Sequence, residues 1–99
     1  MMDKFNEIIQ GEVPVLVDFF ATWCGPCKMM HPVLEKIHEK LGSKVRILKV
    51  DIDKNEQLAA QFNVRSVPTL MIFKGGELKF RTAGVQSAAA LEAELEKYY

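Results

Sequence analysis

The chain has 99 residues, 48% of them hydrophobic and 26% charged, which fits a single folded domain over residues 1–99. Its 13 basic and 13 acidic residues leave a formal net charge of zero, so neither nucleic acid nor an anionic membrane is an expected partner. No stretch of the sequence is apolar for long enough to span a bilayer, and the polar N-terminus lacks the apolar core of a secretion signal. We therefore expect a monomeric protein of the cytoplasm.

The hydrophobic pattern predicts that helices and strands alternate along the first half of the chain. Apolar residues three and four positions apart indicate helices, whereas runs that are apolar on both faces indicate strands covered on both sides. The first four elements are a helix over residues 3–10, a strand over 13–20, a long helix over 24–41 and a strand over 45–52. Because a helix joins the two strands, we expect them to be parallel, with a right-handed crossover. The inward stripe of the long helix is expected to contain Met30, Leu34, Ile37, His38 and Leu41.

The second half of the chain is predicted to contain a hairpin between two helices. These elements are a helix over residues 56–62, strands over 69–73 and 78–82, and a helix over 87–98. Gly75-Gly76 signals a tight turn, so the two strands should pair in antiparallel fashion. Asn55 and Ser87 are the expected N-caps of the two helices. The sequence thus predicts a three-layer α/β/α protein with a central mixed sheet of four strands.

The only two cysteines, Cys24 and Cys27, stand three positions apart. A thiolate is the nucleophile in thiol–disulfide exchange, and the free N–H groups and dipole at a helix start stabilise such an anion. Pro26 suits the first helical turn, Gly25 leaves the approach to Cys24 open, and the spacing brings the two sulfur atoms within bonding reach. Cys24 is therefore expected to attack from the exposed end of the helix, and Cys27, one turn further in, to resolve the mixed disulfide.

Cysteines with this spacing also form half of many zinc sites, and that alternative needs two more ligands. His31 and His38 follow Cys27 and could complete the set on paper. A single helix cannot wrap a tetrahedral ion with ligands spread over about four turns. We therefore expect no metal and no cofactor other than the redox-active Cys24–Cys27 disulfide.

Several separated motifs resemble those of the thioredoxin family. Trp23-Cys24-Gly25-Pro26-Cys27-Lys28 is similar to the family's active site and Val67-Pro68-Thr69 to its cis-proline loop, while Val50-Asp51-Ile52-Asp53 and Phe73-Lys74-Gly75-Gly76 match in order and spacing. The resemblance covers nearly the whole chain and implies the thioredoxin fold. The N-terminus is short beside relatives that carry a fifth strand at the sheet edge, so we expect that edge strand to be missing.

This resemblance also implies a function and two kinds of partner. The function is that of a protein-disulfide reductase, which supplies electrons to oxidised proteins and maintains the redox homeostasis of the cell. Its electrons would come from a flavoprotein, thioredoxin reductase, because the chain has no dinucleotide-binding fingerprint of its own. Its substrates would be proteins that contain disulfides.

Two charged residues on neighbouring strands are candidates for the chemistry. Asp18 shares a strand face with the apolar Leu16 and Phe20, so we expect it to be buried with a raised pKa; a solvent-facing strand residue is the alternative. The resemblance implies that Asp18 takes the proton of Cys27 when that thiol becomes the attacking group. It also implies that Lys49 is coupled to Asp18, whereas a surface lysine with a packed stem is the simpler interpretation.

The resemblance further implies a surface for binding substrate beside Cys24. A cis peptide at Val67-Pro68 would leave the Val67 backbone free to pair with an extended chain; a proline that merely starts a strand is the alternative. An apolar rim that receives partner chains is expected from Trp23, Val67, Gly84 and Val85. Core packing is the alternative role for Trp23.

His31 lies one turn beyond Cys27 and has two interpretations. It is either a partly buried packing residue or, when protonated, a group that favours the thiolate and makes the disulfide more oxidising. Two other functions stay open for the chain: a disulfide oxidant or isomerase, and a binding module that uses the surface around Trp23 within a larger assembly. Gly-Pro between the cysteines resembles reductants more than oxidants.

Overall fold

The computed structural model describes residues 2–99, with side chains from residue 3 onward. The elements in chain order are α1 (Met2–Ile9), β1 (Val15–Phe20), α2 (Gly25–Leu41), the 3-10 helix η1 (Gly42–Lys44), β2 (Arg46–Asp51), α3 (Glu56–Gln61), β3 (Thr69–Lys74), β4 (Glu77–Ala83) and α4 (Ala88–Leu95). Every predicted helix and strand is present with small shifts at its ends, and only η1 was not predicted. None of the described helices is long and apolar enough to cross a membrane.

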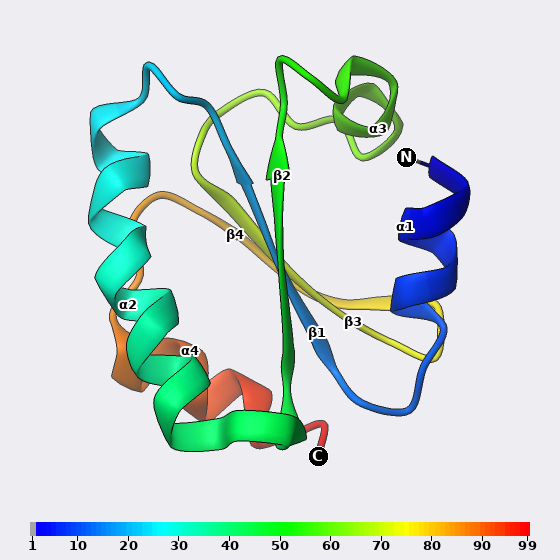
Figure 1. Ribbon diagram of the computed structural model, residues 1–99, viewed down its shortest axis with the longest axis vertical. Helices are drawn as coiled ribbons and strands as arrows, with labels where there is room; N and C mark the ends of the chain where they lie inside the picture. Colours follow the sequence, from blue (N-terminus) through cyan, green and yellow to red (C-terminus); the bar gives the residue numbers. More distant parts are fainter. Residues whose placement is uncertain (1) are drawn as a thin grey trace.

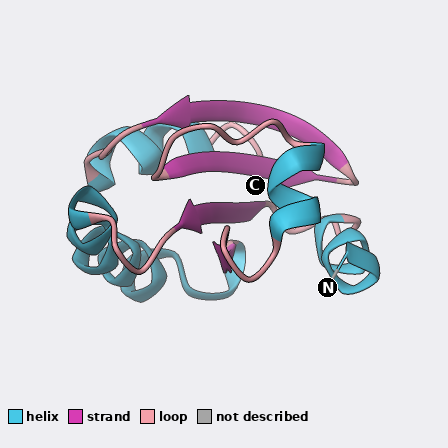
Figure 2. Cartoon of the chain, turned by 90° about the horizontal axis from the view of Figure 1, so that it is seen from above, coloured by secondary structure: helices cyan, strands magenta, loops and turns pink. Residues whose placement is uncertain are grey.

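The strands form one mixed sheet in the order β2-β1-β3-β4. β1 and β2 are parallel, whereas β1 with β3 and β3 with β4 are antiparallel, as the sequence predicts. Helices α2 and α4 cover one face of the sheet and α1 and α3 the other (Figure 1), and the view from above shows the strands lying between these helices (Figure 2). In the described part of the chain, β2 is an outermost strand with a neighbour on one side only.

Strand β1 serves two hydrophobic cores because its side chains alternate between the faces of the sheet. Val15, Val17 and Phe19 join the core beneath α1 and α3. Leu16 joins the core beneath α2 and α4. Asp18 lies two residues after Leu16, so it shares this second face and points toward α2.

Helix α2 buries one stripe of side chains against the sheet. This stripe contains Cys27, Met30, Leu34, Ile37 and Leu41. His38 was expected on the same stripe and is instead exposed, which corrects that prediction. Ile37 occupies the inward position of this turn, and the next residue of an α-helix is rotated by about 100° away from it.

The β3–β4 turn is tied to the segment that follows α1. Gly75 and Gly76 both have positive φ values, 59° and 81°, as a two-residue hairpin turn requires. Their N–H groups donate to the carbonyl oxygens of Gly11 and Ile9 at 3.0 and 2.8 Å. The predicted Gly75-Gly76 turn thereby also fixes the end of α1.

The two expected N-caps differ in what their side chains do. Asn55 occupies the N-cap position of α3 but makes no side-chain capping bond, so the expected cap is wrong in this respect. Its Nδ2 group donates instead to the carbonyl oxygen of Asp51 at 3.0 Å and braces the loop after β2. Ser87 does cap α4, because its hydroxyl accepts from the N–H of Ala90 at 3.1 Å.

Loss of the Ser87 cap is expected to destabilise the protein modestly. Ser87→Ala removes the only side-chain acceptor seen at the start of α4 in the described residues, and such caps contribute about 1 kcal/mol. Urea unfolding should therefore give a lower free energy of unfolding with an unchanged m-value. Ser43→Ala, at an exposed position of η1, is the matched control; equal losses in both variants would contradict the prediction.

Candidate active site

The two cysteines meet at the first turn of α2. Cys24 is the N-cap residue, with φ −88° and ψ 114°, and the backbone N–H of Cys27 donates to its Sγ atom at 3.1 Å. The two residues form a disulfide across a Cα–Cα distance of 5.3 Å. In the reduced state, this N–H and the positive end of the helix dipole would both stabilise a thiolate at Cys24.

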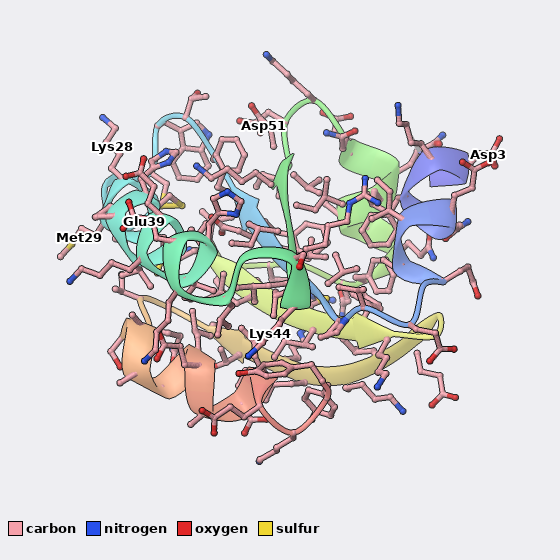
Figure 3. All side chains as sticks on the ribbon, turned by 60° about the horizontal axis from the view of Figure 1, so that its bottom comes forward. Asp3, Lys28, Met29, Glu39, Lys44 and Asp51 are labelled. Atoms are coloured by element: carbon pink, nitrogen blue, oxygen red, sulfur yellow. A yellow bond between two sulfur atoms is a disulfide. The ribbon has the colours of Figure 1, made fainter. Side chains whose placement is uncertain are left out.

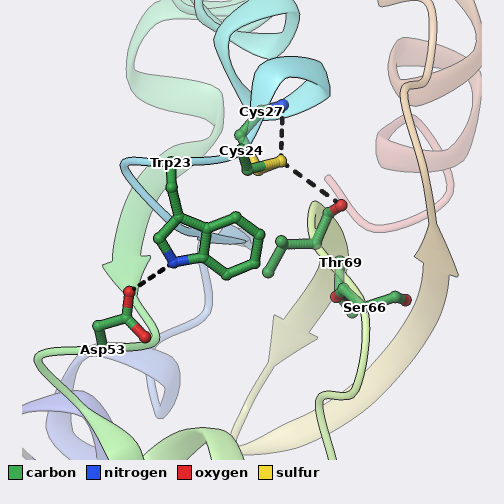
Figure 4. The surroundings of a disulfide bond; sticks show 7 residues. Trp23, Cys24, Cys27, Asp53, Ser66 and Thr69 are labelled. Atoms are coloured by element: carbon green, nitrogen blue, oxygen red, sulfur yellow. Dashed lines mark hydrogen bonds between the residues drawn. A yellow bond between two sulfur atoms is a disulfide. The ribbon is translucent and has the colours of Figure 1, made fainter.

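Exposure does not distinguish the two cysteines in the disulfide form. Each is only 4% exposed, so the prediction that Cys24 lies at an exposed end is wrong for this state. The N-cap conformation turns the Cys24 side chain back over the first turn of the helix, where it meets the N–H of Cys27. What distinguishes Cys24 is its other neighbour, since its Sγ atom lies 3.6 Å from the carbonyl oxygen of Val67 (Figure 4).

The loop that faces the disulfide has the expected cis peptide between Val67 and Pro68. Two hydrogen bonds hold this loop. The Thr69 hydroxyl donates to the carbonyl oxygen of Ser66 at 2.6 Å, and the N–H of Gly84 donates to the carbonyl oxygen of Pro68 at 2.9 Å. The second bond brings the start of the β4–α4 connection beside the disulfide.

The side chains around the disulfide include a large exposed apolar group. Trp23 is 69% exposed and Val85 43% exposed, so core packing is wrong as the role of Trp23. Val67 and Gly84 are half-buried between the loops. At the same end of α2, the exposed side chains of Lys28 and Met29 project away from the sheet (Figure 3).

Asp53 holds the indole of Trp23 in place. The indole Nε1–H donates to Oδ2 of Asp53 at 2.9 Å (Figure 4). The backbone N–H of Asp53 donates in turn to Oδ1 of Asp51 at 2.9 Å. Asp53 was not among the predicted site residues. Its place in the Val50-Asp51-Ile52-Asp53 motif was the one signal that could have found it.

Asp18 lies buried beneath α2, as expected. It is 2% exposed, and its Oδ1 atom has no hydrogen-bond partner among the described residues. Burial raises the pKa of this carboxyl to about 6, and the positive charge of Lys49 acts against that rise. The solvent-facing alternative is therefore wrong, and Asp18 can exchange a proton near neutral pH.

Lys49 and His31 contact each other beside Asp18. Lys49 is paired with Asp18 in the register of β1 and β2, and its Nζ atom contacts Nδ1 of His31 on α2. His31 is exposed, so its interpretation as a partly buried packing residue is wrong. Met30 and Leu34 take the inward positions around it on α2.

The described residues contain no group of three or more His, Cys, Asp or Glu side chains arranged to hold a metal ion. Cys24 and Cys27 are bonded to each other, and His31 contacts Lys49.

The fold and the cysteine pair together define the class of protein. A cysteine pair that can close into a disulfide at the start of a helix, in this α/β/α fold, is the site of the thiol–disulfide oxidoreductases.

Comparison with known proteins gives the family within this class. Residues 1–97 match the family model described as Thioredoxin. Thioredoxin 1 of Nostoc sp. is 46% identical over 93 residues, which are 94% of this chain and 87% of that protein. Thioredoxin of Alicyclobacillus acidocaldarius is 48% identical over 92 residues, which are 93% and 88% of the two chains. The chain belongs to the thioredoxin family.

Solved structures agree with this assignment. A mutant thioredoxin from Halobacterium salinarum superposes with a TM-score of 0.88 at 38% identity, covering 97% of this chain and 83% of that one. Thioredoxin from Trypanosoma brucei brucei superposes with a TM-score of 0.90 at 28% identity, covering 98% and 84%. The protein is accordingly an oxidoreductase, a protein-disulfide reductase that works by dithiol–disulfide exchange on disulfide-containing proteins.

Proposed function

We propose that Cys24 is the nucleophile and Cys27 the resolving cysteine of this reductase. The Cys24 thiolate attacks one sulfur of a substrate disulfide, so an S–S bond breaks and the other substrate sulfur leaves as a thiolate. Cys27 then attacks Cys24, and the second substrate sulfur leaves as the Cys24–Cys27 disulfide forms. Two electrons pass to the substrate. The observation that carries this assignment is the hydrogen bond from the Cys27 N–H to the Cys24 sulfur, which favours the anion at Cys24.

Asp18 is proposed to accept the proton that Cys27 loses in the second step. A general base works best when its pKa lies near the working pH, and burial raises the pKa of Asp18 to about 6. The side chain shares the sheet face that α2 covers, and Cys27 lies on the buried stripe of that helix. Lys49, whose charge lowers the pKa of Asp18, is proposed as the second residue of this proton-accepting unit.

Substrate chains are proposed to dock on the rim formed by Trp23, Val67, Pro68, Gly84 and Val85. Exposed apolar side chains grouped at one place are typical of surfaces that bind other proteins, and Trp23 and Val85 are the large exposed ones here. The Val67 carbonyl next to Cys24 lies where an extended substrate could add backbone hydrogen bonds. Gly25 and Pro26 complete the loop around the nucleophile and are exposed.

The oxidised protein has to be reduced again, and thioredoxin reductase is the proposed electron donor. The proposed setting is the cytoplasm, where thiols are kept reduced, and the proposed working form is the monomer.

A redox titration tests the direction of electron flow. The protein is equilibrated with buffers of reduced and oxidised dithiothreitol or glutathione, and the fraction of Cys24–Cys27 disulfide is measured by trapping free thiols with a mass label. A reductase is expected to have a midpoint of about −270 mV, whereas disulfide isomerases and oxidants have midpoints of about −180 mV or higher. A midpoint at or above about −180 mV would overturn the proposal in favour of a disulfide oxidant or isomerase.

A further inference from the structure

The proposed exchange chemistry gives Lys49 a role but leaves its contact with His31 unexplained. We propose that His31 is a positioning residue for the reaction: it accepts a hydrogen bond from Lys49 and so holds the lysine charge beside the buried Asp18. The inference rests on the proposed role of Asp18 as proton acceptor. His31 would therefore act on Asp18 through Lys49, and not on the Cys24 thiolate directly.

The geometry brings three different elements together at this point. β1 carries Asp18, β2 carries Lys49 directly opposite it in the parallel register, and α2 carries His31 one turn after Cys27. The contact joins Nζ of Lys49 to Nδ1 of His31. An ammonium group can only donate hydrogen bonds, so Nδ1 must be the acceptor and the ring proton must be on Nε2.

Apart from His31, the ammonium group of Lys49 has no ion-pair partner among the described residues that would hold it in place on β2. Lys49 is an exposed residue, and no carboxylate of the described chain lies within ion-pair distance of its Nζ atom. A free lysine side chain samples many rotamers, which would carry its charge away from Asp18 for much of the time. A hydrogen bond to His31 restricts this motion and keeps the charge near the carboxyl group.

Other charged and titratable groups lie around His31 on α2, β1 and β2. On its own helix these are Lys28, one turn before it, and Glu35, one turn after it. The groove that His31 and Lys49 line also contains Glu35, His38, Glu39 and Arg46. Lys49 faces it from β2, and Asp18 lies opposite Lys49 on β1. Asp51 lies two residues after Lys49 and shares its face of β2. Protonation of the ring would remove the acceptor at Nδ1 and place two like charges together, so it would release Lys49.

The test is to titrate the Asp18 carboxyl of the oxidised protein by carbon NMR, because the disulfide prevents the cysteines from titrating. Lys49→Gln is expected to raise the titration midpoint of Asp18, and His31→Ala to raise it by a smaller amount, about half a pH unit. His31→Asn keeps an acceptor in place of Nδ1 and should restore the wild-type midpoint. The matched control is His38→Ala, an exposed histidine of the same helix, which should leave it unchanged.

The double variant His31→Ala/Lys49→Gln decides between an indirect and a direct effect. If His31 acts through Lys49, the titration midpoint of Asp18 in the double variant equals its midpoint in Lys49→Gln alone. An added shift in the double variant, or an unchanged midpoint in His31→Ala, would overturn the inference. The role of Asp18 is tested separately by the rate of exchange, so a failure of that role leaves the order of these midpoints intact and the two failures can be told apart.

Discussion

Cys24→Ser is expected to abolish the reduction of protein disulfides, with a loss of roughly a thousand-fold or more in turnover. A serine hydroxyl does not ionise near neutral pH and cannot replace the thiolate that the Cys27 N–H stabilises at the helix start. The measurement is the rate at which an insulin-like disulfide substrate is reduced with excess dithiol reductant present. A binding module would keep its interactions in this variant, so retained biological activity of Cys24→Ser would support that alternative.

Cys27→Ser is the companion variant for the same prediction. It keeps the nucleophile and loses the resolving thiol, so attack should stop at the mixed disulfide between Cys24 and substrate. Mass spectrometry without reducing agent is expected to show one substrate attached to the Cys27→Ser protein and none to Cys24→Ser. The reverse pattern would mean that the two cysteines have exchanged roles.

Asp18→Asn is expected to change the stability of the oxidised protein by an amount that depends strongly on pH. The pKa of Asp18 rises from 3.8 to about 6 on folding, so the folded state binds its proton more tightly than the unfolded state. The wild-type protein therefore loses about 3 kcal/mol of stability in all as pH rises from below the unfolded pKa to above the folded pKa, and this loss persists at higher pH. Asn does not ionise, so the variant lacks this loss.

Denaturant unfolding at about pH 4 and about pH 8 measures this difference. The free energy of unfolding of Asp18→Asn minus that of wild type should grow by about 2 kcal/mol between the two conditions, because part of the change has already occurred at about pH 4. Glu39→Gln removes an exposed carboxyl from α2 and is the control, with little change expected. A pH-independent difference for Asp18→Asn would show that the carboxyl titrates alike in both states.

The same Asp18→Asn variant tests the proposed chemical role. If Asp18 accepts the proton of Cys27, reduction of protein disulfides should be slower in the variant across roughly pH 6 to 9, by about ten- to a hundred-fold. An unslowed reaction over this range would contradict the role of Asp18 while leaving the stability prediction untouched.

The order and pairing of the elements could be predicted because they depend on local patterns. β1 is apolar on both faces, which indicated a strand covered on both sides, and Gly75-Gly76 indicated a hairpin that the positive φ values confirm. The burial of Asp18 followed from the same alternation. Each of these features depends on a few consecutive residues, so hydrophobic periodicity and turn-forming residues are enough to predict it.

The contacts that were missed join residues far apart in the sequence. Trp23 and Asp53 are thirty residues apart, and His31 and Lys49 eighteen. Their meeting depends on how α2 sits against the edge of the sheet and on the rotamers of exposed side chains, which no local pattern encodes. His38 was misplaced for a simpler reason, since the apolar stripe of α2 is narrower than the run of spaced residues suggested.

The position of β2 at the edge of the sheet has a consequence for solubility. A strand with an unpaired edge can template backbone pairing with another chain, and charged side chains along it oppose such aggregation. The exposed Arg46 and Lys49 of β2 are placed to do this. An apolar replacement of Lys49 would therefore risk assembly into larger species at high protein concentration, which makes glutamine the better probe of its charge.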